Sequence, residues 1–153
     1  MDLILWRHAE AHVLREGQSY LERALTAKGE RQAQRMADWL NQRLAHSTRI
    51  VVSPALRCQQ TAKALDRHFK TVPAIAPEAS VTALLSVARW PEANEPVLVV
   101  GHQPTLGQVV ALLLGETAQT WVVKKGAVWW LRHRDREGLA QVVLQAMQSP
   151  DCL

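Results

Sequence analysis

Four residues of this chain are suited to phosphate chemistry. Each comes shortly after an apolar run of the sequence: Arg7, His8, Arg57 and His102. An arginine guanidinium is always charged, and its fork of donors matches the oxygens of a phosphate group. A neutral imidazole can attack phosphorus, and neighbouring cations favour the neutral form of a histidine. The residue types therefore indicate phosphoryl transfer, provided that the fold brings the separate segments together.

Each of these residues has a definite expected role. His8 is the expected nucleophile, and Arg7 and Arg57 are expected to bind the phosphate oxygens. His102 is expected to donate to those oxygens as charge develops in the transition state. No histidines, cysteines or carboxylates have metal-ligand spacing, and positioning and electrostatics supply most of phosphoryl-transfer catalysis. We therefore expect activity without a metal or any other cofactor.

Three apolar runs are expected to position these residues. The runs are 2–6, 49–53 and 96–101, and their continuous hydrophobicity is typical of strands covered on both faces, as in a parallel sheet. The carboxyl ends of parallel strands meet at one edge of the sheet, where ligands of open α/β folds bind. Residues far apart in the sequence are therefore expected to converge there on one site.

Helical patterns alternate with these strands. They predict helices over 28–45, with Thr26 as N-cap; from 53 through 69, with Ser53 as cap; over 82–90; and over 105–115. A short strand is expected near 72–75, and three more at 121–123, 127–131 and 141–144. This order predicts an α/β fold, a three-layer α/β/α sandwich with a mixed, mostly parallel sheet. We expect one domain over residues 1–153.

Composition narrows the class of protein. The 153 residues carry a net charge of +4, with 48% hydrophobic and 21% charged residues, which is ordinary for a globular domain. The basic residues are dispersed, and the densest run, 132–136, is broken by an acid, so we expect no nucleic-acid partner. No apolar run could cross a membrane, and the amino end lacks a secretory signal. Cys58 and Cys152 form no disulfide framework, which favours a cytoplasmic location.

Four motifs in order resemble the histidine phosphatase superfamily, also known as the phosphoglycerate mutase-like or RHG family. They are Arg7-His8-Ala9-Glu10-Ala11, the segment 25–33, Ser53-Pro54-Ala55-Leu56-Arg57 with its continuation to Ala62, and Val99-Val100-Gly101-His102-Gln103-Pro104. Ala9 stands where many members carry glycine. The resemblance implies that His8 becomes phosphorylated and that Arg7, Arg57 and His102 form the phosphate pocket.

Within the superfamily, the length and the opening motif most resemble the SixA-type phosphohistidine phosphatases. This implies a histidine-phosphorylated signalling or carrier protein as substrate. Many members also use a carboxylate between the second-arginine helix and the second-histidine strand as general acid, and Glu78 lies in that stretch. A phosphohistidine leaving group can instead be protonated on its far ring nitrogen and depart as neutral imidazole, so the acid is dispensable for that substrate.

The short interval between Arg57 and His102 predicts an open site without a large lid. An open pocket favours phosphate displayed on a protein, because small ligands rely on enclosure for much of their contact area. Two alternatives remain at this point. One is a small-molecule phosphatase or mutase on the same scaffold, and the other is a non-catalytic module that binds phosphorylated partners.

Overall fold

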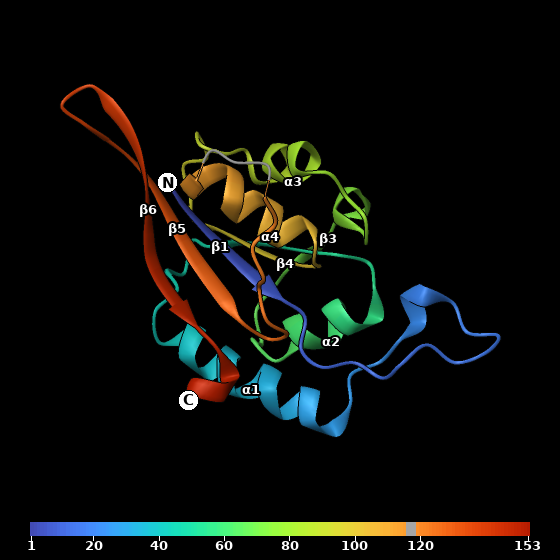
Figure 1. Ribbon diagram of the computed structural model, residues 1–153. Helices are drawn as coiled ribbons and strands as arrows, with labels where there is room; N and C mark the ends of the chain where they lie inside the picture. Colours follow the sequence, from blue (N-terminus) through green and yellow to red (C-terminus); the bar gives the residue numbers. More distant parts are fainter. Residues whose placement is uncertain (116–118) are drawn as a thin grey trace.

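A six-stranded mixed sheet forms the centre of the computed structural model, which describes residues 1–115 and 119–153 (Figure 1). The sheet order is β3-β2-β4-β1-β5-β6. The strands are β1 (Asp2–Arg7), β2 (Arg49–Val52), β3 (Lys70–Thr71), β4 (Val97–Gly101), β5 (Val128–Arg136) and β6 (Leu139–Gln148). The first four run parallel, whereas β5 pairs antiparallel with β1 and β6 pairs antiparallel with β5. The predicted fold class is confirmed.

Helices cover both faces of the sheet, which makes the three layers (Figure 1). The helices are α1 (Ala27–Asn41), α2 (Leu56–Lys63), α3 (Val81–Ala88) and α4 (Thr105–Val110), and α4 continues as a π-helical turn over Ala111–Gly115. Successive side chains of a strand point to opposite faces. Ile4 and Trp6 therefore pack in the core beneath α1 and α2, and Leu3 and Leu5 in the core beneath α3 and α4.

The N-terminus of α1 follows the sequence expectation. The Thr26 side chain accepts a hydrogen bond from the backbone N–H of Gly29, which confirms Thr26 as the N-cap. Gly29 itself is required by close packing, since a Cβ atom there would lie 2.0 Å from the carbonyl oxygen of Glu10. This contact holds the start of α1 against the segment that follows β1.

Several predicted boundaries are wrong. Helix α2 begins at Leu56 and ends at Lys63, so neither its predicted start at Ser53 nor its extension to Phe69 holds. The strand predicted near 72–75 lies instead at Lys70–Thr71, on the edge of the sheet, and Pro73, which has no N–H and a fixed φ, begins the 3-10 turn Pro73–Ile75. Residues 121–123 form no strand, because the carbonyls of Trp121 and Val123 accept hydrogen bonds from side chains.

No large lid lies between α2 and β4, where the chain holds only β3, the 3-10 turn Pro73–Ile75 and α3. This interval packs into the core beneath α3 and α4 through Ile75, Leu84 and Ala88. Across the described ranges, no helix combines the length and apolar character that a membrane span requires.

Candidate active site

The sheet register brings the two predicted histidines together. Arg7 is paired with Gly101 where β1 and β4 run parallel, so His8 and His102 leave neighbouring strands at the same edge. The backbone N–H of His8 also donates to the carbonyl of Gly101 at 3.2 Å. The centroids of the two imidazole rings lie 5.5 Å apart, and both side chains are buried.

Helix α2 places Arg57 beside this pair. The helix begins four residues after β2, which pairs in parallel with β4. Arg57 is fully buried, and its Nη2 lies 3.4 Å from Nδ1 of His102. One turn later, the Thr61 hydroxyl donates to the Arg57 carbonyl and accepts from the N–H of Ala9. This bridge sets the spacing between α2 and the segment that carries His8.

The hydrogen bonds of His8 define its tautomer. Its Nδ1 lies 2.7 Å from the carbonyl oxygen of Ala9, and a carbonyl can only accept, so Nδ1 carries the proton. In the neutral ring the lone pair is then on Nε2. The backbone around His8 is held as well, because its carbonyl accepts from the N–H of Gly126 at 3.0 Å.

Arg7 and Arg57 are each held in place by a hydrogen bond from one guanidinium nitrogen. Nη1 of Arg7 donates to the carbonyl of Val123 at 3.0 Å, and Nη1 of Arg57 donates to that of Tyr20 at 2.8 Å. The Nε atoms of both arginines are buried and have no acceptor among the described residues. A buried donor without an acceptor costs about 1–3 kcal/mol, so an oxyanion at this place would relieve an existing penalty.

Ser53 is a site residue whose sequence context indicated only a helix cap. Its hydroxyl lies 2.7 Å from Nε2 of His102 and accepts from the N–H of Ala55 at 3.2 Å. Because the Arg57 guanidinium can only donate, Nδ1 of His102 is the acceptor and Nε2 the donor. Ser53 therefore holds the His102 ring, although it precedes α2 and does not cap it. Its place directly after a buried strand was the available signal.

Burial and positive charge keep both histidines neutral. The pKa of His8 falls from 6.5 to about 3, chiefly because burial disfavours the charged ring, and also because Arg57 and Arg7 are close. The pKa of His102 also falls to about 3, through burial first and then through His8, Arg57 and Arg7. The site therefore offers an unprotonated imidazole next to two guanidinium groups.

The lowered pKa values predict that acid destabilises the protein. As pH falls from about 6.5 to about 3, the unfolded chain binds protons that His8 and His102 do not. Their contribution to stability is therefore complete above the unfolded pKa and is lost as pH falls through this range.

Between about pH 7.5 and pH 5, the urea midpoint should fall less in His8→Asn than in wild type. His12→Asn, which alters an exposed histidine, should keep the wild-type drop. An equal drop in His8→Asn would contradict the low pKa.

The thiol of Cys58 touches the site without being reactive. Its Sγ lies 3.5 Å from Nε2 of His102 and is fully buried. Burial raises the pKa of this thiol to about 12, so it stays protonated at neutral pH. Since the thiolate is the reactive form, the structure favours packing as the role of Cys58.

The candidate acid Glu78 and the motif residue Glu10 lie in different surroundings. Glu78 is exposed in the turn before α3, where it has a φ of 70°. A hydrogen bond from Thr105 to the carbonyl of Ala79 ties this turn to the start of α4, three residues after His102. Glu10 instead accepts a 2.7 Å hydrogen bond from the hydroxyl of Thr26, so it holds a neighbouring side chain.

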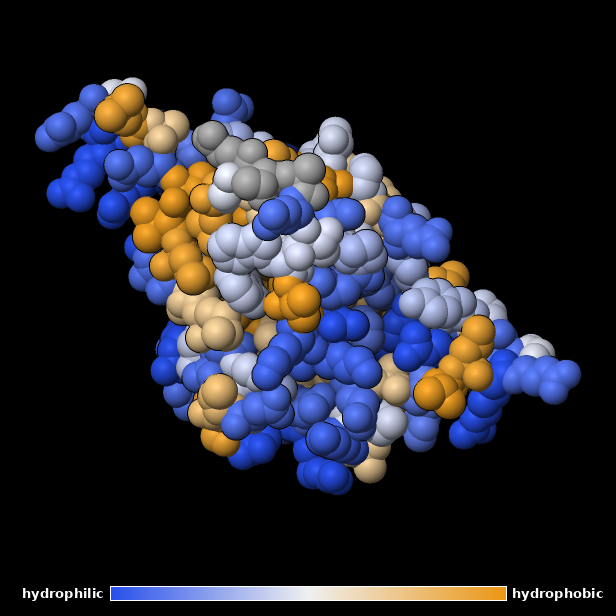
Figure 2. Space-filling model, in the orientation of Figure 1, coloured by the Kyte–Doolittle hydropathy of each residue, from blue (hydrophilic) through white to orange (hydrophobic). Residues whose placement is uncertain are grey.

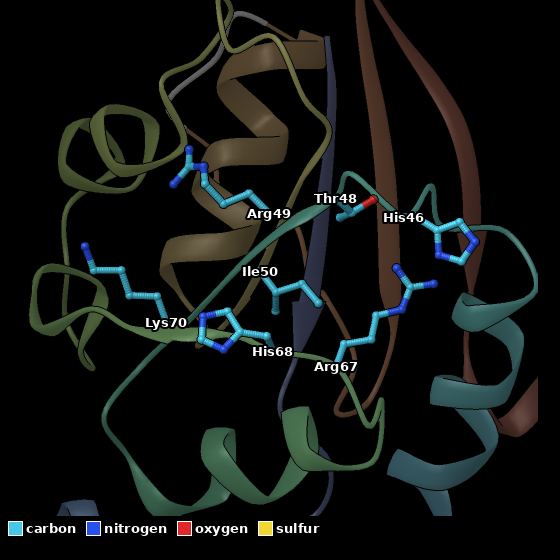
Figure 3. A pocket seen from close by; sticks show the side chains of 7 residues that line it. All are labelled: His46, Thr48, Arg49, Ile50, Arg67, His68 and Lys70. Carbon is cyan, nitrogen blue, oxygen red and sulfur yellow. The ribbon is translucent and has the colours of Figure 1, made fainter.

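A second basic cavity lies at the opposite edge of the sheet, at the amino ends of β2 and β3. It encloses about 560 Å³, and its arginines point to opposite sides (Figure 3). Arg49 pairs with Glu95 at 3.0 Å, and Arg67 donates to carbonyls near the end of α1. Since both guanidinium groups have protein partners, this cavity lacks the convergent donors of the His8 site.

Among the described residues, no three histidines, cysteines or carboxylates are grouped so that they could hold a metal ion.

Comparison with known proteins identifies the family. Residues 3–80 match the model of the histidine phosphatase superfamily, branch 1. The chain is 35% identical over 140 residues to an uncharacterized protein of Picosynechococcus, covering 86% of this chain and 85% of that protein. It is 33% identical to a phosphohistidine phosphatase SixA homolog of Haemophilus influenzae, over 76% and 79% of the two chains.

The solved structures agree with the sequence relatives. The structure of the protein histidine phosphatase SixA complexed with tungstate superposes with a TM-score of 0.77 at 26% identity, over 99% of both chains. The fold and the motif order therefore define a phosphatase of the phosphoglycerate mutase-like class. This chain belongs to the histidine phosphatase superfamily, and within it the chain is SixA-like.

Proposed function

We propose that this protein removes phosphate from phosphohistidine on a signalling or carrier protein, through a covalent phosphohistidine intermediate on His8. The observation that carries the proposal is the neutral His8 ring, whose Nδ1–H is held by the Ala9 carbonyl, close to the buried Arg57 and the partly buried Arg7. Similarity to a phosphohistidine phosphatase SixA homolog supports the substrate class. Residues 1–153 act as one domain, in the cytoplasm, without a metal or other cofactor.

In the first step, the lone pair on Nε2 of His8 forms a bond to phosphorus while the bond from phosphorus to the substrate nitrogen breaks. The substrate imidazole carries a proton on its far nitrogen, so it leaves as a neutral ring. On the enzyme side, the carbonyl of Ala9 keeps the proton on Nδ1 of His8. The phosphorylated His8 is therefore itself ready to leave as neutral imidazole.

In the second step, water attacks phosphorus and the electron pair of the broken bond returns to Nε2 of His8. Both protons of the water stay on the oxygens of the phosphate that is released. Arg7 and Arg57 bind the phosphoryl oxygens in both steps and offset their charge. The bound dianion raises the pKa of His102, because opposite charges favour the protonated ring. The new Nδ1–H of His102 then donates to a phosphoryl oxygen. The Nε2–H of the same ring keeps its hydrogen bond to the Ser53 hydroxyl.

Ser53 acts in this scheme as a positioning residue, which Ser53→Ala tests. Loss of the hydrogen bond to a charged imidazole costs about 1.5–3 kcal/mol, so kcat should fall roughly ten- to a hundredfold. The pH dependence of kcat should shift as well, because His102 loses the acceptor that stabilises its protonated form. Ser80→Ala, which removes the N-cap of α3, is the matched control and should keep both kcat and its pH profile. An unchanged pH profile in Ser53→Ala would contradict the positioning role.

The principal alternative is a small-molecule phosphatase or mutase at the same site. An ester leaves as an alkoxide and needs a proton, and Glu78 is the candidate acid for that reaction, since its turn is tied to α4 near His102. The second alternative is a module that only binds phosphorylated partners. Binding alone would not require a neutral, oriented His8.

The deciding experiment compares substrates side by side. We expect the kcat/KM for a histidine-phosphorylated phosphotransfer domain to exceed that for sugar phosphates and phosphoglycerates. Glu78→Gln should leave the phosphohistidine reaction unchanged. A clear preference for one small metabolite, with loss of that activity in Glu78→Gln, would establish the alternative enzyme. Phosphate binding without any turnover would establish the binding module.

A further inference from the structure

An ordered loop projects from the edge of the sheet that carries the active site. This rim loop, residues 12–24, is the blue segment at the right of Figure 1. An isolated bridge between Ala11 and Leu25 and a hydrogen bond from the N–H of His12 to the carbonyl of Ala24 close its base. Ser19 and Glu22 form a capping box around a 3-10 turn within it. The loop therefore has a defined shape.

The rim loop is attached to the phosphate pocket through Arg57. The carbonyl of Tyr20 accepts from Nη1 of Arg57 at 2.8 Å, and the Arg57 guanidinium lies 4.4 Å from the centroid of the Tyr20 ring. Arg23 is close enough to contribute to the lowered pKa values of His8 and His102. The loop consequently forms one wall of the entrance to His8.

The outer part of this loop presents apolar side chains to solvent. Val13 is 81% exposed, Leu14 50% and Leu21 42%. Figure 2 shows apolar side chains gathered at the projecting right end of the molecule. Two arginines and two glutamates within 12–24 cancel in charge. A contact made by this surface is therefore expected to be apolar rather than driven by charge of one sign.

We propose that the rim loop is a docking surface for the protein substrate and that Val13, Leu14 and Leu21 pack on an apolar surface beside its phosphohistidine. The inference rests on the proposed function. His8 is only 5% exposed, so a phosphohistidine side chain reaches it only when the substrate backbone comes up to the rim. A small phosphate ester has no backbone to bring up to the rim, so we expect it to reach His8 without contacting Val13 or Leu14.

The test uses the full chain and the double variant Val13→Ser/Leu14→Ser. The kcat/KM for a histidine-phosphorylated phosphotransfer domain should fall roughly tenfold or more, mostly through KM, because serine buries less apolar area against the substrate than valine or leucine does. The kcat/KM for p-nitrophenyl phosphate should not change. Leu139→Ser is the matched control, because Leu139 is 68% exposed at the far end of the β5–β6 hairpin. It should leave both activities unchanged.

Each other outcome overturns the inference in a recognisable way. Unchanged phosphoprotein turnover in the double variant would show that the loop makes no productive contact. Equal losses on phosphoprotein and p-nitrophenyl phosphate would place the effect in the pocket rather than in docking. An equal loss in Leu139→Ser would show a non-specific effect of surface polarity. A wild-type protein that hydrolyses p-nitrophenyl phosphate but no phosphohistidine protein would overturn the proposed function and, with it, the docking surface.

Discussion

Replacing His8 with alanine is expected to abolish turnover and to eliminate the phosphoenzyme. Without Nε2 of His8, the pocket lacks its oriented nucleophile, since Nε2 of His102 is protonated and hydrogen-bonded to Ser53, its Nδ1 lone pair accepts from Arg57, and the thiol of Cys58 is protonated. Loss of a catalytic nucleophile lowers kcat by roughly ten-thousandfold or more. The neighbouring Arg7 and Arg57 should still bind phosphate, so the variant should lose chemistry rather than binding.

Phosphoenzyme trapping measures this directly. Brief incubation of the wild type with labelled substrate, followed by denaturation, should leave phosphate on the protein that is labile to acid and stable to base. His8→Ala should carry none, whereas His12→Ala, which changes an exposed histidine four residues later, should be labelled like the wild type. Near-normal turnover in a folded His8→Ala protein would refute the two-step mechanism.

The next largest effects are expected for Arg57→Ala and His102→Ala. Each removes a donor to the charge that develops on the phosphoryl oxygens, and such a donor is worth roughly a hundredfold or more in rate. Arg57→Ala also removes the hydrogen bond to the Tyr20 carbonyl, so it should lower the free energy of unfolding as well. Arg57→Lys keeps the charge without the fork of donors and should give an intermediate rate.

A matched arginine separates chemistry from folding. The Arg67 side chain makes three hydrogen bonds and that of Arg57 two, but those of Arg67 lie at the opposite edge of the sheet, to Asn41 and to the carbonyls of Ala45 and Leu44. Arg67→Ala should lower the thermal midpoint while leaving the rate per folded molecule unchanged. A wild-type rate in folded Arg57→Ala or His102→Ala would exclude that residue from the catalytic pocket.

Local sequence patterns were sufficient to predict the layered fold and the meeting of the histidines. Apolar runs identify buried strands, and parallel strands carry whatever follows them to one edge of the sheet. Arg7, His8 and His102 each end or directly follow such a strand, so their convergence required only the strand order. The cap at Thr26 was equally predictable, because capping depends on residues three positions apart.

Contacts between distant segments could not be predicted in the same way. Ser53 has the sequence context of a helix cap, yet its hydroxyl is hydrogen-bonded to His102, which lies 49 residues away, directly after another strand. Arg7 and Arg57 are anchored by the carbonyls of Val123 and Tyr20. Every residue has a carbonyl group, so no residue type reveals which carbonyl will accept.

The sequence by itself therefore determined the α/β order, the family and the four residues proposed to handle phosphate. The tertiary structure decided how those residues are oriented and charged. It sets the tautomer of His8 through the Ala9 carbonyl and brings the pKa of His8 and His102 to about 3. Burial and electrostatic interaction depend on distances in space between segments far apart in the chain, and local patterns carry no measure of those distances.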